Sequence, residues 1–276
     1  MKRRLLMVLF SIMLLGILAA CGGGSDEPNE TEDADSGTTD DTEATEGGDK
    51  DVYTVATDNG YVPFEYIDEE SGDLVGFDID LISALASEVG VEIEFETLDF
   101  DGIVAGIGSG RFDIGIAGMT ITDERKESID FTQPYYEAGL ILAVKEGNDD
   151  IKSIDDVEGK TIATRTGSTS QEYLEANTEA DIEAFPGIIE AYQNVLAGRA
   201  DAVLYDLPNV EFYSETEAEN ELNTVGEKLT GEDYGVAFPK DSELRDDFDD
   251  ALTTIKENGT YDDIYEEWFG DRPEGN

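Results

Sequence analysis

The sequence predicts an α/β protein whose folded part is built from two lobes. From Val52 onward, short β-rich runs alternate with helical patterns, an alternation typical of α/β architecture. The alternation begins again near Ile154, which indicates a second sheet with its own helices. The 276 residues, 39% of them hydrophobic, suffice for one or two cores of ordinary size.

The first half of the folded part contains two strand–helix units. Strands are predicted over residues 52–57, 91–97 and 112–117, and helices over residues 78–89 and 101–108. In the first helix, apolar residues recur at helical spacing, with Asp78 as the expected N-cap and Gly90 as the expected stop. The strand over 112–117 runs into a loop that begins at Gly118.

The second half repeats this pattern. Strands are predicted over residues 161–164, 201–204 and 234–238, and helices over residues 168–177, 190–197, 242–257 and 261–269. Gly259 separates the last two helices. These patterns alone do not assign the segment after residue 232 to either lobe.

The charge balance of the chain is strongly acidic. There are 67 Asp and Glu against 17 Lys and Arg, a formal net charge of -50. Nucleic acids and anionic membrane surfaces are therefore poor partners. Because such a surface repels itself until salt screens it, we expect adaptation to a salty, halophilic environment.

Histidine is absent, and Cys21 is the sole cysteine. The chain therefore lacks the usual neutral-pH proton shuttle and the commonest metal ligand. It also cannot form an intramolecular disulfide or a cysteine-based metal cluster. We expect neither catalysis nor a cofactor or metal.

Residues 1–20 have the pattern of a secretion signal. A basic start at Lys2, Arg3 and Arg4 precedes an apolar run over residues 5–20. As a helix this run spans about 24 Å, which is short for a bilayer core. It ends in Leu-Ala-Ala-Cys-Gly around Cys21, which resembles the lipobox of bacterial lipoproteins, so Cys21 is expected to carry two acyl chains that anchor the protein.

Residues 22–51 consist mainly of Gly, Ser, Thr, Asp and Glu. A segment this polar and self-repelling is predicted to be a disordered tether with a reach of roughly 30 Å. Together with Cys21 it would hold the folded module beside a membrane partner, on the outer face of the cell membrane.

Several stretches of the folded part match one known family. They are the residues at 55–58 (VATD), 62–65 (VPFE), 76–80 (GFDID), 117–125 (AGMTITDER), 129–131 (IDF), 199–202 (RADA) and 257–261 (ENGTY). Over nearly all of residues 52–271 the chain resembles the family 3 solute-binding proteins of ABC importers, and especially the glutamine-binding members.

The resemblance implies a two-lobed periplasmic-binding-protein-like fold of type II, with mixed sheets flanked by helices. It places the first lobe at residues 52–134 and 235–276 and the second at 140–229. Two crossovers at 135–139 and 230–234 would form a two-strand hinge, on which the lobes close around ligand.

A site for an α-amino acid needs a cation for the carboxylate and acceptors for the ammonium. The family places its carboxylate-binding arginine at the position of Arg125, aided by backbone N–H groups of Thr120 and of the turn from Gly167 to Thr169. A surface Arg125 paired with Glu124 or Glu127 is the alternative from the residues alone.

The resemblance also assigns the other groups of the ligand. Asp206 would take the ammonium, with the Thr120 hydroxyl and the Gly118 carbonyl as further acceptors. A loop-capping role is the alternative for Asp206. Tyr61 and Phe100 would sandwich the aliphatic stem, unless they only pack in the core.

For the side chain of the ligand, the resemblance points to Asp58 as acceptor and Arg165 as donor, which together suit the carboxamide of glutamine. The chain departs from the glutamine-binding pattern in three places, where Arg165 replaces a lysine, Tyr205 a histidine and Thr169 a glycine. Glutamate and arginine therefore stay open as alternative ligands.

Two other functions use the same scaffold. A dehydratase would need an acid or base in the cleft that ligand binding leaves free, and none stands out. A sensor ectodomain would continue into a membrane span, and the sequence contains no second hydrophobic segment. The expected partners are thus a polar amino acid, the permease of an ABC transporter, and the membrane through the lipid anchor only; we expect a monomer.

Overall fold

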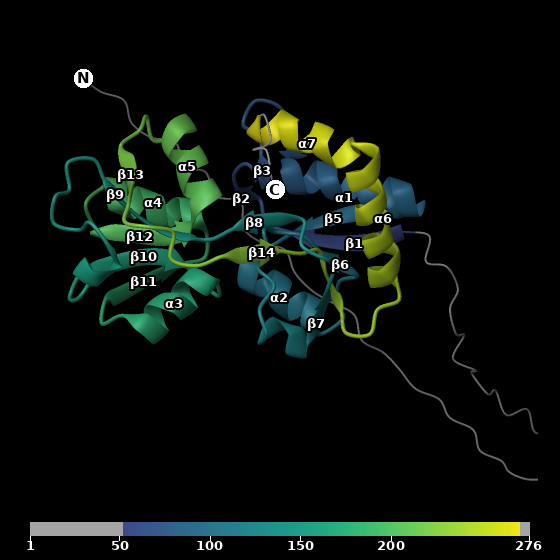
Figure 1. Cartoon of the computed structure of the whole chain (residues 1–276), viewed down its shortest axis with the longest axis horizontal. Helices are drawn as coiled ribbons and strands as arrows, with labels where there is room; N and C mark the ends of the chain where they lie inside the picture. Colours follow the sequence, from purple (N-terminus) through teal and green to yellow (C-terminus); the bar gives the residue numbers. More distant parts are fainter. Residues whose placement is uncertain (1–51, 271–276) are drawn as a thin grey trace, which may run out of the picture. The chain divides into compact units, whose positions relative to one another are not determined.

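The computed structural model describes residues 52–270 (Figure 1). The predicted signal peptide at 1–20, the lipid attachment site Cys21 and the predicted tether at 22–51 lie outside the described residues. Between Val52 and Gly270, no helix has the length and apolar character needed to cross a membrane. The described part folds around two five-stranded sheets of mixed direction, as predicted.

The first lobe is built on a sheet with strand order β5-β1-β6-β15-β7. Its strands are β1 (Val52–Thr57), β5 (Glu92–Thr97), β6 (Ile114–Gly115), β7 (Ile129–Phe131) and β15 (Ala237–Pro239). β1 runs parallel to β5 and β6, whereas β15 is antiparallel to β6 and β7. A small antiparallel sheet of β2 (Gly60–Tyr61), β3 (Glu65–Ile67) and β4 (Leu74–Val75) follows β1.

Helices cover both faces of the first sheet. They are α1 (Phe77–Val89), α2 (Phe100–Gly108), α6 (Leu244–Asn258) and α7 (Thr260–Phe269). Figure 1 shows α1, α6 and α7 grouped on one side and α2 on the other. The C-terminal helices α6 and α7 therefore pack with α1 beside the first sheet.

The second lobe is built on a sheet with strand order β11-β10-β12-β9-β13. Its strands are β9 (Leu140–Lys145), β10 (Thr161–Arg165), β11 (Asp181–Phe185), β12 (Ala202–Asp206) and β13 (Leu222–Val225). Its helices are α3 (Thr169–Asn177), α4 (Ile188–Leu196) and α5 (Leu207–Thr216). Two short 3-10 turns complete the elements, η1 (Arg125–Glu127) in the first lobe and η2 (Ile154–Asp156) in the second.

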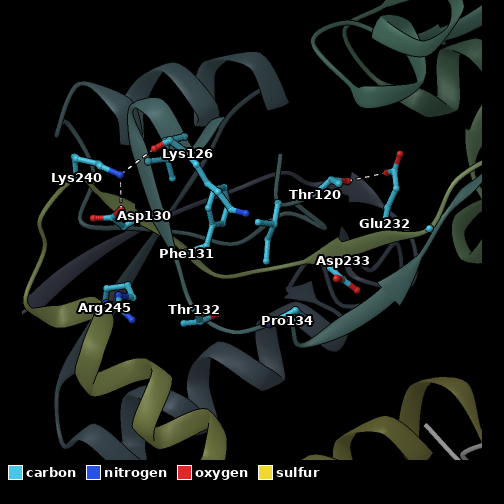
Figure 2. A pocket seen from close by; sticks show the side chains of 13 residues that line it. Thr120, Lys126, Asp130, Phe131, Thr132, Pro134, Glu232, Asp233, Lys240 and Arg245 are labelled. Atoms are coloured by element: carbon cyan, nitrogen blue, oxygen red, sulfur yellow. Dashed lines mark hydrogen bonds and ion pairs between the residues drawn. The ribbon is translucent and has the colours of Figure 1, made fainter. Parts of the chain in front are cut away.

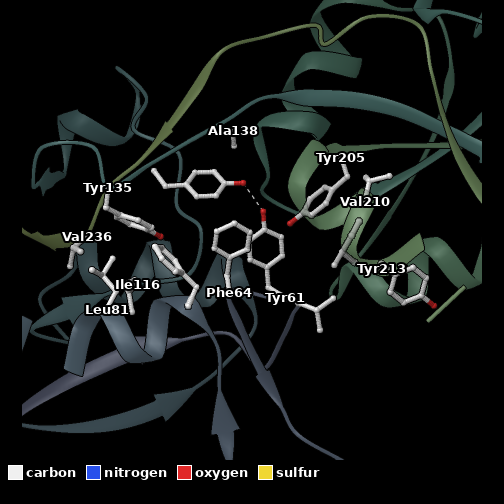
Figure 3. Close-up of a cluster of buried hydrophobic side chains, with 14 of the residues drawn as sticks. Tyr61, Phe64, Leu81, Ile116, Tyr135, Ala138, Tyr205, Val210, Tyr213 and Val236 are labelled. Carbon is white, nitrogen blue, oxygen red and sulfur yellow. Dashed lines mark hydrogen bonds between the residues drawn. The ribbon is translucent and has the colours of Figure 1, made fainter. Parts of the chain in front are cut away.

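A connecting ribbon of two antiparallel strands carries the chain between the sheets. It consists of β8 (Tyr136–Ala138) and β14 (Glu232–Tyr234), with Glu232 opposite Ala138 and Tyr234 opposite Tyr136. One buried aromatic cluster includes residues of both lobes and the ribbon (Figure 3). In it the Tyr61 ring stacks on Phe64 at 5.1 Å between centroids and meets Tyr205 edge-on at 5.8 Å.

Three local predictions need correction. Only Ile114 and Gly115 of the strand predicted over 112–117 are strand, because the chain then leaves the sheet toward the site. The strand predicted over 234–238 divides, since Tyr234 pairs in the ribbon and Ala237 in the first sheet. Asp78 does not cap α1, because Gly76 is the N-cap and the Asp78 carboxylate is buried below it.

Candidate functional site

The ten predicted ligand residues lie where strands end and the next elements begin. Asp58 follows β1, Tyr61 ends β2, Phe100 begins α2, Gly118 and Thr120 follow β6, Arg125 begins η1, Arg165 ends β10, Thr169 begins α3, and Tyr205 and Asp206 end β12. In open α/β sheets, ligands bind beyond the carboxyl ends of strands. Hydrogen bonds, an ion pair and ring contacts join these ten residues, two of them through Glu232.

Asp58 and Arg165 form an ion pair between the two lobes. The Nη1 atom of Arg165 donates to Asp58 Oδ2 at 2.9 Å, and the Arg165 side chain is only 2% exposed. The other oxygen of Asp58 accepts from the backbone N–H groups of Asn59 and Gly60. Opposite charges therefore neutralise each other inside this part of the site.

Aromatic rings enclose the Arg165 guanidinium. Its Cζ lies 4.1 Å from the centroid of Phe100, 5.1 Å from that of Tyr61 and 5.3 Å from that of Tyr205. These distances are in the range of cation–π attraction. Tyr61 and Phe100, predicted to sandwich a ligand's stem, thus flank the group predicted to bind its side chain.

Two polar atoms beside this pair are buried and have no hydrogen-bond partner among the described residues. They are Arg165 Nε and the hydroxyl of Tyr205. Leaving a buried polar group unpaired costs about 1–3 kcal/mol. Arg165 Nε offers a donor and Tyr205 a donor or acceptor, so the side-chain subsite has unused capacity for a polar ligand.

Asp206 is the acceptor of a buried hydroxyl network. Its Oδ2 accepts from the hydroxyl of Tyr61 at 2.7 Å and from the hydroxyl of Tyr234, and the two tyrosine hydroxyls lie 2.6 Å apart. Although Asp206 directly precedes α5, its side chain makes no capping hydrogen bond. The structure therefore contradicts the loop-capping alternative.

Burial raises the pKa of Asp206, whereas hydrogen bonds from Tyr234 and Tyr61 and the charges of Arg165 and Arg125 lower it. Burial also holds the pKa of both tyrosines well above its usual value, so their hydroxyls keep their protons and donate. An ammonium group brought to this carboxylate would be a further favourable partner.

Arg125 reaches from the first lobe to the second. It is 7% exposed, and it donates to the carbonyl oxygens of Thr120 at 2.8 Å and Gly167 at 3.1 Å. Its Cζ also lies 5.1 Å from the centroid of Phe100. This burial rules out the surface pairing with Glu124 or Glu127.

One expected helper of Arg125 is otherwise engaged. The backbone N–H of Gly167 donates to the side chain of Gln171, so it does not point freely at a ligand carboxylate.

Gly118 lies directly against Tyr61, because a Cβ at Gly118 would be 2.2 Å from the Tyr61 ring. Only glycine fits there, and its φ of +53° favours glycine as well.

A residue that the sequence analysis did not identify, Glu232, lies at the centre of the contacts between Thr120 and Thr169. Both hydroxyls donate to Glu232 Oε2 at 2.9 Å, and Thr230 donates to Oε1 at 3.2 Å. Figure 2 shows the Thr120–Glu232 bond at one end of a cavity of about 610 Å³, with Lys240 and Asp130 paired elsewhere in its wall.

Two further buried acids, Glu65 and Asp78, lie next to the site, where Asp78 contacts Gly118. Asp78 Oδ2 accepts from the Gly118 N–H and the Tyr135 hydroxyl, each at 2.8 Å. Burial raises the pKa of Asp78 to about 6 and that of Glu65 well above its usual value. Neither oxygen of the Glu65 carboxyl group has a hydrogen-bond partner among the described residues, so its burial and the nearby charge of Asp78 disfavour its charged form.

Comparison with known proteins shows which family has this sequence. Residues 53–271 match the family model of the bacterial extracellular solute-binding proteins, family 3. The L-cystine-binding protein TcyA of Bacillus subtilis is 32% identical over 277 residues, covering 98% of each chain. The ABC transporter glutamine-binding protein GlnH of the same organism is 31% identical over 279 residues, covering 99% of each chain.

Solved structures give the same result. An ancestral arginine-binding protein bound to glutamine superposes with a TM-score of 0.76 and 43% identity, over 80% of this chain and 99% of its own; the same protein is also known bound to arginine. An ancestral amino acid-binding protein, AncCDT-1, described as a precursor of cyclohexadienyl dehydratase, has 39% identity and a TM-score of 0.73, over 79% of this chain and 96% of its own.

Proposed function

Because the chain belongs to family 3 of the bacterial extracellular solute-binding proteins, we propose that it captures a polar L-amino acid, glutamine first, between its lobes and delivers it to the permease of an ABC importer. The Asp58–Arg165 pair carries the choice of glutamine, since it presents one acceptor and one donor side by side in a buried, aromatic-walled subsite.

The groups common to all amino acids have separate partners in this proposal. Arg125 binds the carboxylate as a planar, bidentate cation. Asp206, the Thr120 hydroxyl and the Gly118 carbonyl accept from the ammonium. Tyr61 and Phe100 contact the aliphatic stem.

The charge balance of the side-chain subsite favours a neutral ligand. Asp58 already neutralises Arg165 at 2.9 Å, so a carboxamide can accept from Arg165 and donate to Asp58 without adding charge. The carboxylate of glutamate would face Asp58, and the guanidinium of arginine would face Arg165. Either like-charge approach in a buried site is costly.

The relatives extend the proposal to place and partners. The family is extracellular, and TcyA and GlnH are named as binding proteins, whereas AncCDT-1 is described as a precursor of a dehydratase. We therefore propose binding without chemistry, secretion through residues 1–20, lipidation of Cys21, an acidic disordered tether over 22–51, and adaptation of the acidic protein surface to salt. We likewise propose a first lobe of 52–134 and 235–276, a second of 140–229, and a hinge at 135–139 and 230–234.

Calorimetric titration tests this function. The compact unit Asp49–Asn276, freed of ligand in high salt, is titrated with glutamine, glutamate, asparagine, arginine and cystine. Glutamine should bind most tightly and be recovered unchanged by mass spectrometry. Arginine, glutamate or cystine binding more tightly would contradict the glutamine assignment, and turnover, or no binding of any amino acid, would contradict the binding function itself.

A further inference from the structure

Glu232 belongs to the ribbon and yet contacts both lobes. It lies on β14, opposite Ala138 of β8. A single oxygen, Oε2, accepts from Thr120 of the first lobe and Thr169 of the second, each at 2.9 Å. Among the hydrogen bonds within residues 52–270, no other single oxygen atom of the site accepts one hydroxyl hydrogen bond from each lobe.

The Glu232 carboxylate is buried without a cation. The residue is 7% exposed, and the ion pairs formed within residues 52–270 do not include it. Repulsion from Asp206 adds to burial in raising the pKa of Glu232, and the charge of Glu232 in turn acts to raise the pKa of Arg125. Two carboxylates thus share the end of the site at which an ammonium is expected.

Glu232 also determines which way two hydroxyls are oriented. A threonine hydroxyl has one proton and two lone pairs. Because Thr120 gives its proton to Glu232, its oxygen can only accept from a ligand. An ammonium, which only donates, suits such an oxygen, whereas an α-keto or deaminated ligand leaves it unpaired.

We infer that Glu232 is a specificity-determining residue for the amino group of the ligand: it fixes Thr120 as an acceptor and adds a second carboxylate beside Asp206. The inference rests on the proposed amino-acid binding and adds to it the requirement for a cationic α-nitrogen. Glu232 acts through Thr120 and through its charge, without touching the ligand's side chain.

The test compares a ligand with and without its amino group. L-glutamine and glutaramate, its deaminated analogue, are titrated against parent and Glu232→Gln forms of Asp49–Asn276. Glu232→Gln should weaken glutamine roughly 10- to 100-fold, the range for losing a charged hydrogen-bond acceptor. Glutaramate should bind unchanged or more tightly, since an amide at 232 can donate and free the Thr120 proton.

Two further variants separate this role from a structural one. Glu137→Gln removes an exposed carboxylate from the other ribbon strand and should change neither affinity. Thr169→Val breaks only the second-lobe contact and should weaken both ligands by the same factor, because it acts on closure. If Glu232→Gln does not fold, Glu232→Asp, which keeps the charge, should retain the preference for glutamine.

Equal weakening of glutamine and glutaramate by Glu232→Gln would overturn the inference, and so would no change in either affinity. Failure of the parent to bind glutamine at all is a separate result, which concerns the proposed ligand. In that event, arginine and its deaminated analogue replace the pair, and the same comparison applies.

Discussion

The two ends of the site differ in how they manage buried charge. At the side-chain end, Asp58 and Arg165 neutralise each other at 2.9 Å among three aromatic rings. At the amine end, Asp206 and Glu232 are both acids, and hydroxyl groups supply their hydrogen bonds. The charges at the side-chain end balance each other, whereas the two acids at the amine end form no ion pair within residues 52–270.

This difference indicates which charges a ligand should carry at each end of the site. A neutral side chain at the first end keeps the Asp58–Arg165 balance intact, and an ammonium at the second offsets the burial of two carboxylates. In the proposed binding mode, Arg125 would supply the cation for the ligand's carboxylate. A zwitterion with an uncharged polar side chain satisfies all three demands together, and the following predictions test this in order of expected effect.

Arg125→Ala should remove binding of every amino acid, because the position of the ligand at both ends depends on the contact between Arg125 and the ligand's carboxylate. Loss of one partner of a buried charged contact implies a loss of at least about 100-fold by calorimetry. Arg111→Ala is the matched control, since Arg111 is an exposed arginine paired with Glu96 at 2.6 Å. Retained binding of any amino acid by Arg125→Ala would contradict its role.

Arg165→Met should change the ranking of ligands instead of abolishing binding. It leaves Asp58 unpaired, so glutamine should lose about 10-fold or more while arginine gains. The double variant Asp58→Asn with Arg165→Met restores neutrality and should return the preference to neutral side chains. If every ligand weakens equally in Arg165→Met, the side-chain end is elsewhere.

Glu65→Gln should change stability and leave ligand preference alone. The pKa values of Glu65 and Asp78 are raised in the fold, so their contribution to stability is complete below the unfolded values near 4 and is lost as pH rises through the folded values, about 6 for Asp78. A glutamine at 65 stays neutral and avoids this loss.

Urea unfolding at several pH values measures that effect. The advantage of Glu65→Gln over the parent should be small near pH 4.5 and grow with pH, by at most about 1.4 kcal/mol per pH unit for each proton. Glu69→Gln, an exposed neighbour, should follow the parent. Parallel curves for Glu65→Gln and the parent would show that Glu65 is ionised throughout.

Salt should act on the surface more than on either end of the site. The net charge of -50 makes the fold repel itself at low ionic strength. Raising NaCl from about 0.1 M to about 2 M should therefore raise the melting temperature while the glutamine affinity changes less than about 3-fold, because the site's charges are buried. A larger change in affinity than in stability would contradict the proposed salt adaptation.

Local patterns in the sequence account for most helices. α1, α3, α4, α6 and α7 begin and end within two residues of their predicted bounds, and Gly90 and Gly259 adopt the left-handed conformation that ends a helix. Several elements were missed, among them the strands β9, β11 and β13 and the helix α5. Periodicity does not separate the continuously buried run of β9 from a buried helix segment, and α5 has a weak apolar face.

The site was predictable only where the family resemblance marked it. The structure brings the ten marked residues together, but the resemblance gave no ligand role to Glu65, which ends the matching stretch 62–65, or to Glu232 and Tyr234, which lie in the predicted crossover 230–234. Glu232 is one of 67 acidic residues, and it meets Thr120 and Thr169 across 112 and 63 residues of chain. Contacts at such separations depend on how two lobes and a ribbon pack, which periodicity and spacing do not report.

The most direct test of the account is a crystal structure of Asp49–Asn276 with L-glutamine. The account predicts the side-chain amide between Asp58 and Arg165, the carboxylate on Arg125, and the ammonium on Asp206 and Thr120 with Glu232 behind it. A ligand bound in the reverse direction, or with its amide away from the Asp58–Arg165 pair, would contradict the division of the site into a charge-balanced end and a cation-seeking end.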